Sequence, residues 1–248
     1  MKKLLALVIL SVALWGCAST VNTTNMNADE HLNYAMKLFN DGDYMESINE
    51  FQAILLQFPG SAVTDQAQYY LAESHFKRGE YILAAYEYSR LIKDIPASKL
   101  VPQAQFQLAE SYYKLSPDFQ LDQRYTNKSV EEFQAFIDFF PTDPRVPEAE
   151  KKIKELNDKL AEKEFHTAEI YEKMEYYEAA IYYYNIVTDT YHDSKYAPSA
   201  QYNKIRTLVQ IKENKTALKE IASFLQRYPS DGNVTAVKKL QETLNKNG

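Results

Sequence analysis

The chain has 248 residues, of which 45% are apolar and 25% charged, with a formal net charge of -6 at pH 7. This composition suits one or two folded domains and excludes collagen-like and mostly disordered chains, and the negative charge argues against nucleic acid as a partner. One Cys and six Gly beside 20 Tyr and 12 Phe exclude a disulfide framework within the chain, argue against glycine-rich phosphate loops, and favour helices that pack through aromatic side chains.

Residues 1–16 have the features of a secretory signal peptide. Lys2 and Lys3 form a basic start, and an apolar run from Leu4 to Leu14 follows them. This run is too short to cross a bilayer, which takes about 20 residues, but it has the length of a signal-peptide core.

Cys17 is the single Cys of the chain, and Leu14 and Gly16 precede it by three residues and one residue. This arrangement resembles the bacterial lipobox, whose Cys carries fatty-acyl chains such as palmitate and becomes the new N-terminus. We therefore expect lipidation of Cys17; ordinary signal cleavage and a buried, unmodified Cys are the alternatives. Ala18, rather than Asp, follows the Cys, and by the sorting rule of diderm lipoproteins this predicts the outer membrane. Residues 17–28 would form the lipidated end and a flexible tether.

From Asp29 onward, the chain repeats a pattern of small, small, aromatic and proline positions, with steps of 12, 4 and 8 residues. The sets are Ala35, Ser47, Phe51 and Pro59; Ala72, Ala84, Tyr88 and Pro96; Ala109, Ser129, Phe133 and Pro141; Ala168, Ala180, Tyr184 and His192; and Ile205, Ala217, Ile221 and Pro229. Only the first step of the third set is longer, at 20 residues. The pattern is typical of tetratricopeptide repeats, in which small residues let two antiparallel helices cross closely. It predicts an all-α solenoid of five helix pairs.

Two irregular spacings and the C-terminus complete the predicted architecture. The segment Ser116 to Asn127 is expected to be a long loop within the third repeat. Val146 to Met174 is expected to be one elongated helix, because its 14 extra residues are close to four helical turns. Val234 to Leu244 would form a capping helix. We therefore expect an N-terminal block of repeats 1–3 over residues 29–147, and the long helix, repeats 4–5 and the cap over 148–248.

Catalytic and metal-binding motifs are absent from the sequence. The four His residues are scattered along the chain, and no HExxH, GxSxG, GxxxxGKS or GxGxxG occurs. Most carboxylates alternate with Lys, as in Glu148 to Lys163, which is typical of a solvated helix face. We therefore expect no enzyme, no catalytic residue, no metal and no cofactor.

The candidate binding residues lie on the first helices of repeats 1–3. In the second and third repeats an aromatic residue precedes a Glu by four positions, and another aromatic follows three positions later; the first repeat has apolar residues at matching offsets. The set is Met36, Phe39, Tyr69, Glu73, Phe76, Phe106, Glu110 and Tyr113. Residues four and seven apart share a helix face, which would form a groove for an extended peptide with apolar and aromatic side chains. The alternative is that these aromatics pack between repeats and the glutamates are merely solvated.

Two segments carry a resemblance to a known family, QRYTNKSVEEFQAFIDFFP at 123–141 and KLAEKEFHTAEIY at 159–171. With the lipobox and the five repeats, they resemble the BamD family of outer-membrane assembly lipoproteins. The resemblance implies a lipid-anchored scaffold facing the periplasm. Its N-terminal repeats would receive unfolded outer-membrane protein segments, and its C-terminal repeats would bind the periplasmic domains of a BamA-like insertase. The alternative function is a tetratricopeptide adaptor that coordinates cell-wall synthesis with envelope constriction.

Overall fold

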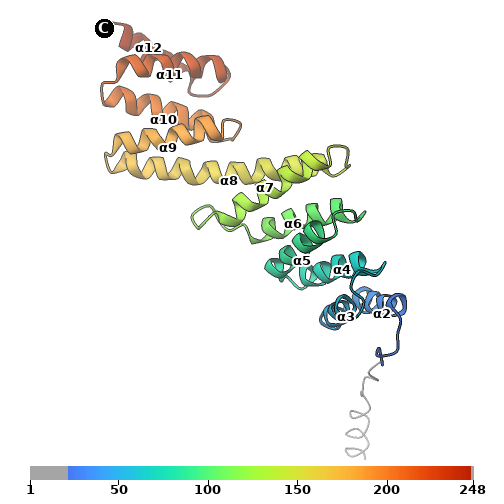
Figure 1. Ribbon diagram of the computed structural model, residues 1–248. Helices are drawn as coiled ribbons and strands as arrows, with labels where there is room; N and C mark the ends of the chain where they lie inside the picture. Colours follow the sequence, from blue (N-terminus) through green and yellow to red (C-terminus); the bar gives the residue numbers. More distant parts are fainter. Residues whose placement is uncertain (1–21, 247–248) are drawn as a thin grey trace, which may run out of the picture.

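The computed structural model describes residues 22–246, and this part of the chain contains eleven α-helices and no strand. The helices are α2 (Ala28–Asp41), α3 (Tyr44–Gln57), α4 (Thr64–Lys77), α5 (Tyr81–Asp94), α6 (Val101–Leu115), α7 (Arg124–Phe139), α8 (Val146–Lys173), α9 (Tyr177–Thr190), α10 (Ala197–Gln210), α11 (Asn214–Arg227) and α12 (Val234–Lys246). Figure 1 shows them stacked in chain order as an elongated array, with α2 and α12 at opposite ends. The predicted all-helical repeat fold is confirmed. The predicted signal peptide and Cys17 lie outside the described residues.

The five predicted pairs and the terminal helix appear in the expected order. The small and aromatic positions of the repeats lie in the core: Ala84, Tyr88, Ala180 and Tyr184 are all fully buried. Within residues 22–246, no helix combines the length and apolar character that crossing a membrane requires.

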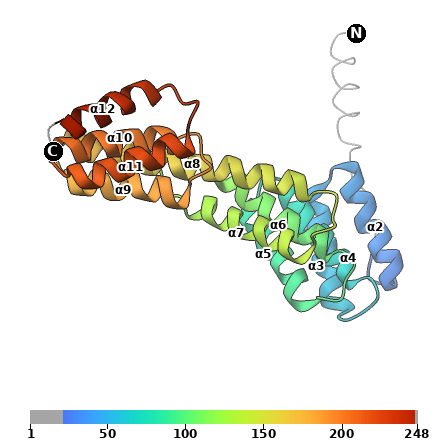
Figure 2. The same ribbon diagram turned by 90° about the horizontal axis from the view of Figure 1, so that it is seen from above.

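The elongated helix α8 spans 28 residues without a break, as expected. Its first half contributes Ala149 and Leu156 to a core with α6 and α7. Its second half contributes Ala161 and Phe165 to a separate core with α9 and α10. Figure 2 shows α8 extending from beside α7 to beside α9 and α10. The helix therefore takes part in two different hydrophobic cores, one with the third repeat and one with the fourth and fifth repeats.

The loop of the third repeat is shorter than predicted. It covers Ser116 to Gln123, and Arg124 to Asn127 form the first turn of α7 instead. Buried Gln123 explains the difference: its side-chain amide donates to the Asp118 and Leu121 carbonyls at 2.8 and 3.0 Å. These bonds hold the loop end next to the first turn of α7, so helix formation starts earlier than the spacing alone indicates.

A polar link between the two helices of a repeat recurs along the array and was not predicted. In each link, one residue lies four positions before the first residue of the repeat pattern, as Gln68 does before Ala72. Its partner is the Glu directly before the third residue of the pattern, as Glu87 is before Tyr88. The links are His31–Glu50 at 2.5 Å, Gln68–Glu87 at 2.7 Å, Gln105–Glu132 at 2.8 Å and Gln201–Glu220 at 3.1 Å. Repeat four has Glu164 and Tyr183 at these positions, and burial raises the pKa of Glu164. These links give buried polar groups a partner and fix the register of the helix pairs in repeats one, two, three and five.

Ala84→Leu is expected to destabilise the array by about 1–3 kcal/mol, because a larger side chain at a fully buried helix crossing forces strain. Denaturant unfolding followed by far-UV circular dichroism measures the change. Ser89→Leu, at an exposed position of the same helix, is the matched control. Equal stability of the two variants would place Ala84 outside the helix crossing.

Candidate functional site

The eight residues of the candidate groove lie on α2, α4 and α6, the first helices of repeats 1–3. Their burial divides them into two groups. Glu73, Phe106 and Glu110 are buried, with exposed fractions of 8%, 7% and 8%. The half-buried members are Met36, Phe39, Tyr69, Phe76 and Tyr113.

Glu73 is engaged inside the protein. Its Oε1 accepts hydrogen bonds from Tyr69 Oη at 3.0 Å, from Tyr88 Oη at 2.5 Å and from Gln107 Nε2 at 2.6 Å. These donors come from α4, α5 and α6, so one carboxylate joins repeat two to repeat three. Burial, and then the nearby Glu73 charge, raise the pKa of both tyrosines, which keeps them protonated as donors. The carboxylate is therefore held between the repeats and is not a free charge on the surface.

Glu110 is neutralised by the next repeat. Lys152 of α8 places its Nζ 2.7 Å from Glu110 Oε1. The same ammonium lies 4.1 Å from the centre of the Tyr113 ring, a cation–π geometry. Tyr113 Oη donates to Glu155 Oε2 at 2.9 Å, so its ring spans the junction between α6 and α8. Glu110 and Tyr113 thus bind the third repeat to the elongated helix.

Phe106 belongs to the hydrophobic core. Its ring makes edge-to-face contacts with Phe133 and Phe136, at centroid distances of 5.5 and 5.3 Å. The Arg145 guanidinium covers it at 5.1 Å from the ring centre. Asp143 fixes that guanidinium through two hydrogen bonds of 2.8 and 2.7 Å. Phe106 therefore packs between helices, and the Arg145 side chain from the α7–α8 loop lies over its ring.

The Asp143–Arg145 pair predicts a pH-dependent contribution to stability. The Arg145 hydrogen bond lowers the pKa of Asp143, so its contribution is complete above the unfolded-state pKa, about 3.9, and is lost as the pH falls through the lower folded-state pKa. The stability difference between the native protein and Asp143→Asn should therefore stay constant down to about pH 5 and narrow below about pH 4. Urea unfolding of both proteins between about pH 6 and about pH 2.5 measures it. A difference that widens on acidification would contradict this sign.

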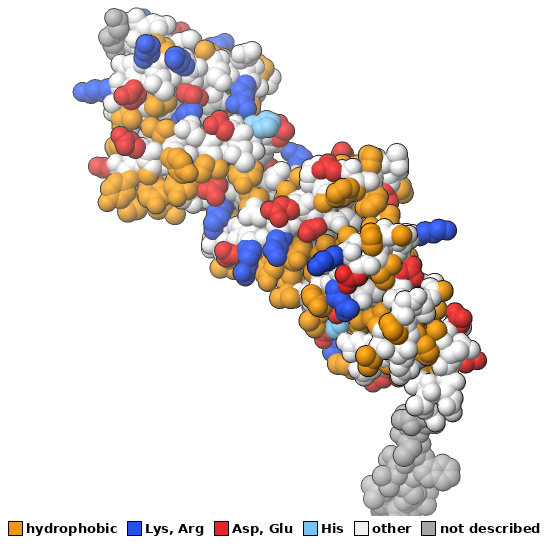
Figure 3. Space-filling model, viewed as in Figure 1, with side chains coloured by type: hydrophobic (Ala, Val, Ile, Leu, Met, Phe, Trp, Pro, Cys, Tyr) orange, Lys and Arg blue, Asp and Glu red, His pale blue; other side chains and the backbone are white. Residues whose placement is uncertain are grey.

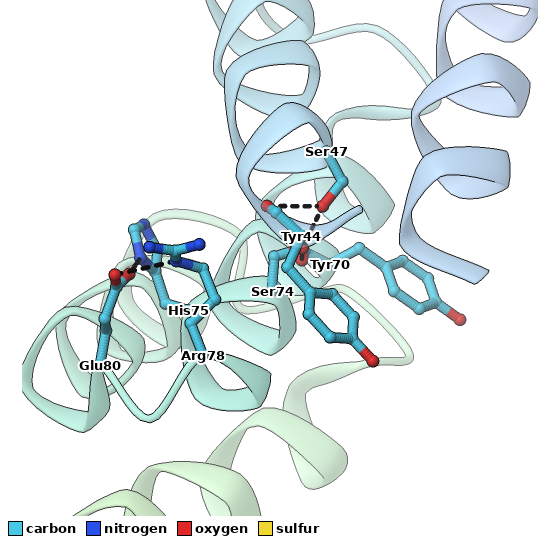
Figure 4. A network of polar contacts seen from close by, with 7 residues as sticks. All are labelled: Tyr44, Ser47, Tyr70, Ser74, His75, Arg78 and Glu80. Atoms are coloured by element: carbon cyan, nitrogen blue, oxygen red, sulfur yellow. Dashed lines mark hydrogen bonds and ion pairs between the residues drawn. The ribbon is translucent and has the colours of Figure 1, made fainter. Parts of the chain in front are cut away.

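Phe39 lies in an aromatic cluster at the junction of repeats one and two. It makes edge-to-face contacts with Tyr44 and Tyr70 at 5.5 and 5.2 Å. Figure 4 shows these two tyrosines extending in the same direction from α3 and α4. Next to them, the buried hydroxyls of Ser47 and Ser74 are hydrogen-bonded at 2.9 Å. The buried Ser47–Ser74 hydrogen bond therefore fixes the junction, and the half-buried Phe39 ring lies beside it.

Phe76 lies near the α4–α5 turn, where its ring contacts Tyr81 edge to face at 5.2 Å. Glu80 closes this turn by accepting from Arg78 at 2.9 Å, and its other oxygen lies 2.7 Å from the His75 ring nitrogen (Figure 4). The hydrogen bond with His75 has the largest effect on the pKa of Glu80, and both bonds lower that pKa. Phe76 is thus a half-buried ring on a turn that hydrogen bonds hold closed.

Among residues 22–246, no group of His, Cys, Asp and Glu is arranged to hold a metal ion.

Known proteins are similar to this chain over most of its length. The family model of YfiO, described as "Outer membrane lipoprotein", matches residues 24–206. The outer membrane protein assembly factor BamD of Rickettsia prowazekii (strain Madrid E) is 29% identical over 231 residues, or 92% of each chain. The TPR2AB-domain:pHSP90 complex of yeast Sti1 aligns with 88% of this chain and 98% of that one, at 14% identity and a TM-score of 0.43. A thermophilic tetratricopeptide protein of Thermus thermophilus has the same coverages, 15% identity and a TM-score of 0.38. This chain, with its five helix pairs and its family match over most of its length, belongs to the YfiO family of outer membrane lipoproteins.

Proposed function

We propose that this protein is a non-catalytic scaffold of outer-membrane β-barrel assembly, anchored in the outer membrane by lipidated Cys17 and facing the periplasm. The observation that carries the proposal is the BamD relative, whose similarity covers 92% of both chains. Stacked helix pairs fit the role, because an open solenoid offers extended surfaces to other polypeptides. The proposed partners are unfolded outer-membrane protein segments and the periplasmic domains of a BamA-like insertase.

The N-terminal repeats are the proposed site for the unfolded segment. Phe39, Phe76 and Tyr113 present partly exposed rings on three successive first helices. Such rings can accept apolar and aromatic side chains of an extended peptide with little loss of rotamer freedom. Glu73 and Glu110 would contribute indirectly, without contacting the peptide. Their contacts to Gln107 and Lys152 hold neighbouring repeats in register.

The C-terminal repeats are the proposed insertase site. Because α8 contributes to two separate cores, a change on the α4 or α6 face need not disturb α9 to α11. The two binding activities should therefore be separable by mutation.

The double change Phe76→Ala with Tyr113→Ala is expected to weaken binding of an aromatic-ended barrel-protein peptide by about tenfold, the effect of losing anchor residues. Insertase association should survive. Fluorescence anisotropy measures the peptide affinity, and pull-down of the insertase measures partner retention on the same purified variant.

The matched control is Tyr86→Ala with Phe139→Ala, which removes two well-exposed rings from α5 and α7. If peptide and insertase binding fall together without loss of helicity, the division between the two groups of repeats is wrong. If neither changes, the rings on α4 and α6 serve packing only.

A further inference from the structure

A second apolar surface lies at the C-terminal end of α8 and the start of α9. Ile170, Met174, Tyr176 and Tyr182 are each more than half exposed there, at 54–62%. Figure 3 shows hydrophobic side chains gathered over this end of α8. We call this surface, with the glutamates described below, the aromatic–acidic patch.

The geometry of the patch is fixed by ring stacking and by the turn. Tyr171 of α8 and Tyr183 of α9 stack with a centroid distance of 5.3 Å and an interplanar angle of 7°. Tyr182 contacts Tyr183 edge to face at 5.3 Å. Glu175 has a left-handed backbone with φ 62°, and the Tyr176 amide donates to the Tyr171 carbonyl at 2.9 Å. The rings are therefore presented on a defined surface.

Three adjoining hollows surround this helix end. The largest has a volume of about 640 Å³ and is lined by Tyr171, Tyr176 and Ile211 among others. It shares Glu175 and Tyr177 with a second hollow of about 420 Å³ between α8 and α10. The second hollow in turn shares residues of α8 with a third, of about 340 Å³, beside the α6–α7 loop. We call these three neighbouring hollows the recess; a row of hollows along a helix end suits a polypeptide segment better than a compact small molecule.

The recess is negatively charged. Its lining carries five glutamates against two basic side chains, namely Glu169, Glu172, Glu175, Glu178 and Glu213 against Lys173 and Arg206. His166 lies 2.8 Å from Glu169. Glu175, Glu178 and Glu213 take part in none of the ion pairs found between residues 22 and 246. Three carboxylates beside exposed aromatic rings are therefore available to an outside cation.

We propose that the aromatic–acidic patch docks a polypeptide segment of a partner protein in which Arg or Lys side chains alternate with aliphatic ones. A guanidinium or ammonium gains both from the faces of exposed tyrosines and from neighbouring carboxylates. Aliphatic side chains would bury the exposed surface of Ile170 and Met174. An acidic segment, or an anionic membrane surface, would be repelled. This site lies on α8 to α11, within the C-terminal repeats proposed above to bind the insertase; the inference deepens that proposal, rests on it, and does not depend on peptide binding by repeats 1–3.

The experiment uses the full chain in detergent and three labelled synthetic peptides: one alternating Arg and Leu, one with Glu in place of Arg, and one with Ser in place of Leu. Fluorescence anisotropy at two salt concentrations measures their affinities. Only the Arg–Leu peptide should bind, and added salt should weaken it. Equal binding of the Glu–Leu peptide would overturn the charge argument, and equal binding of the Arg–Ser peptide would overturn the apolar one.

Two double variants locate the site. Met174→Ser with Tyr176→Ser removes the apolar part, and Glu175→Lys with Glu213→Lys reverses the charge. Each should weaken the Arg–Leu peptide at least about tenfold, which corresponds to loss of an anchor group.

The matched controls change exposed residues of the same kinds elsewhere: Leu56→Ser with Phe139→Ser, and Glu131→Lys with Glu242→Lys. Both should leave the affinity unchanged. The proposal is overturned if a control weakens binding as much as a patch variant. It is also overturned if only Phe76→Ala with Tyr113→Ala weakens it, or if sedimentation shows a dimer that Met174→Ser with Tyr176→Ser dissociates, because a second copy would then cover the patch.

Discussion

Cys17→Ser is expected to release the protein from the outer membrane into the soluble periplasmic fraction. Each buried methylene of an acyl chain contributes about 0.8 kcal/mol, and stable anchoring takes at least two chains. The variant would lose all of them, while the repeats that begin at α2 stay intact. Membrane fractionation combined with palmitate labelling measures both the location and the acylation.

Ser19→Ala, two residues further along the predicted tether, is the control and should remain lipidated and anchored. Thermal unfolding of Cys17→Ser should match the native protein. Retention of the variant in the outer membrane after a wash that strips peripheral proteins would contradict lipid anchoring.

Tyr88→Ala is expected to have the largest effect on stability, about 3–5 kcal/mol, the range for truncating a buried aromatic side chain. Tyr88 is fully buried in the core of the second repeat and donates to Glu73. Truncation to Ala leaves a cavity. It also removes one of the hydrogen bonds that hold Glu73, the carboxylate that joins repeat two to repeat three. Denaturant unfolding followed by circular dichroism measures the change.

Tyr88→Phe separates the two contributions, because it keeps the ring and removes only the hydrogen bond; we expect about 1–2 kcal/mol. Tyr86→Ala, an exposed residue of the same helix, should change stability by no more than about 0.5 kcal/mol. Equal effects of Tyr86→Ala and Tyr88→Ala would contradict the repeat assignment.

The sequence predicted the repeats well because their signal is local. Small residues such as Ala84 and aromatic residues such as Tyr88 recur at fixed steps, and both of these side chains have no exposed surface. The end of the third-repeat loop was missed because it depends on hydrogen bonds from Gln123 to backbone carbonyls. No periodic pattern marks such bonds.

The candidate site was predictable as a set of helix positions, but the burial of each residue was not. Phe106 is covered by Arg145, and Glu73 is bound by Gln107, which lies 34 residues further along the chain. Such contacts arise from the stacking of repeats. The Gln–Glu links were detectable in principle, because Gln68–Glu87 and Gln201–Glu220 share a separation of 19 residues.

The central claim is a role in outer-membrane protein assembly, and depletion of the protein in cells tests it most directly. The measurement is the amount of folded barrel protein in the outer membrane, followed by heat-modifiable gel mobility as the protein is depleted. We predict that folded barrel proteins fall before growth stops and that Phe76→Ala with Tyr113→Ala restores them only in part. Normal barrel-protein levels together with a defect in cell-wall synthesis at constriction sites would contradict the assembly role and support the adaptor function instead.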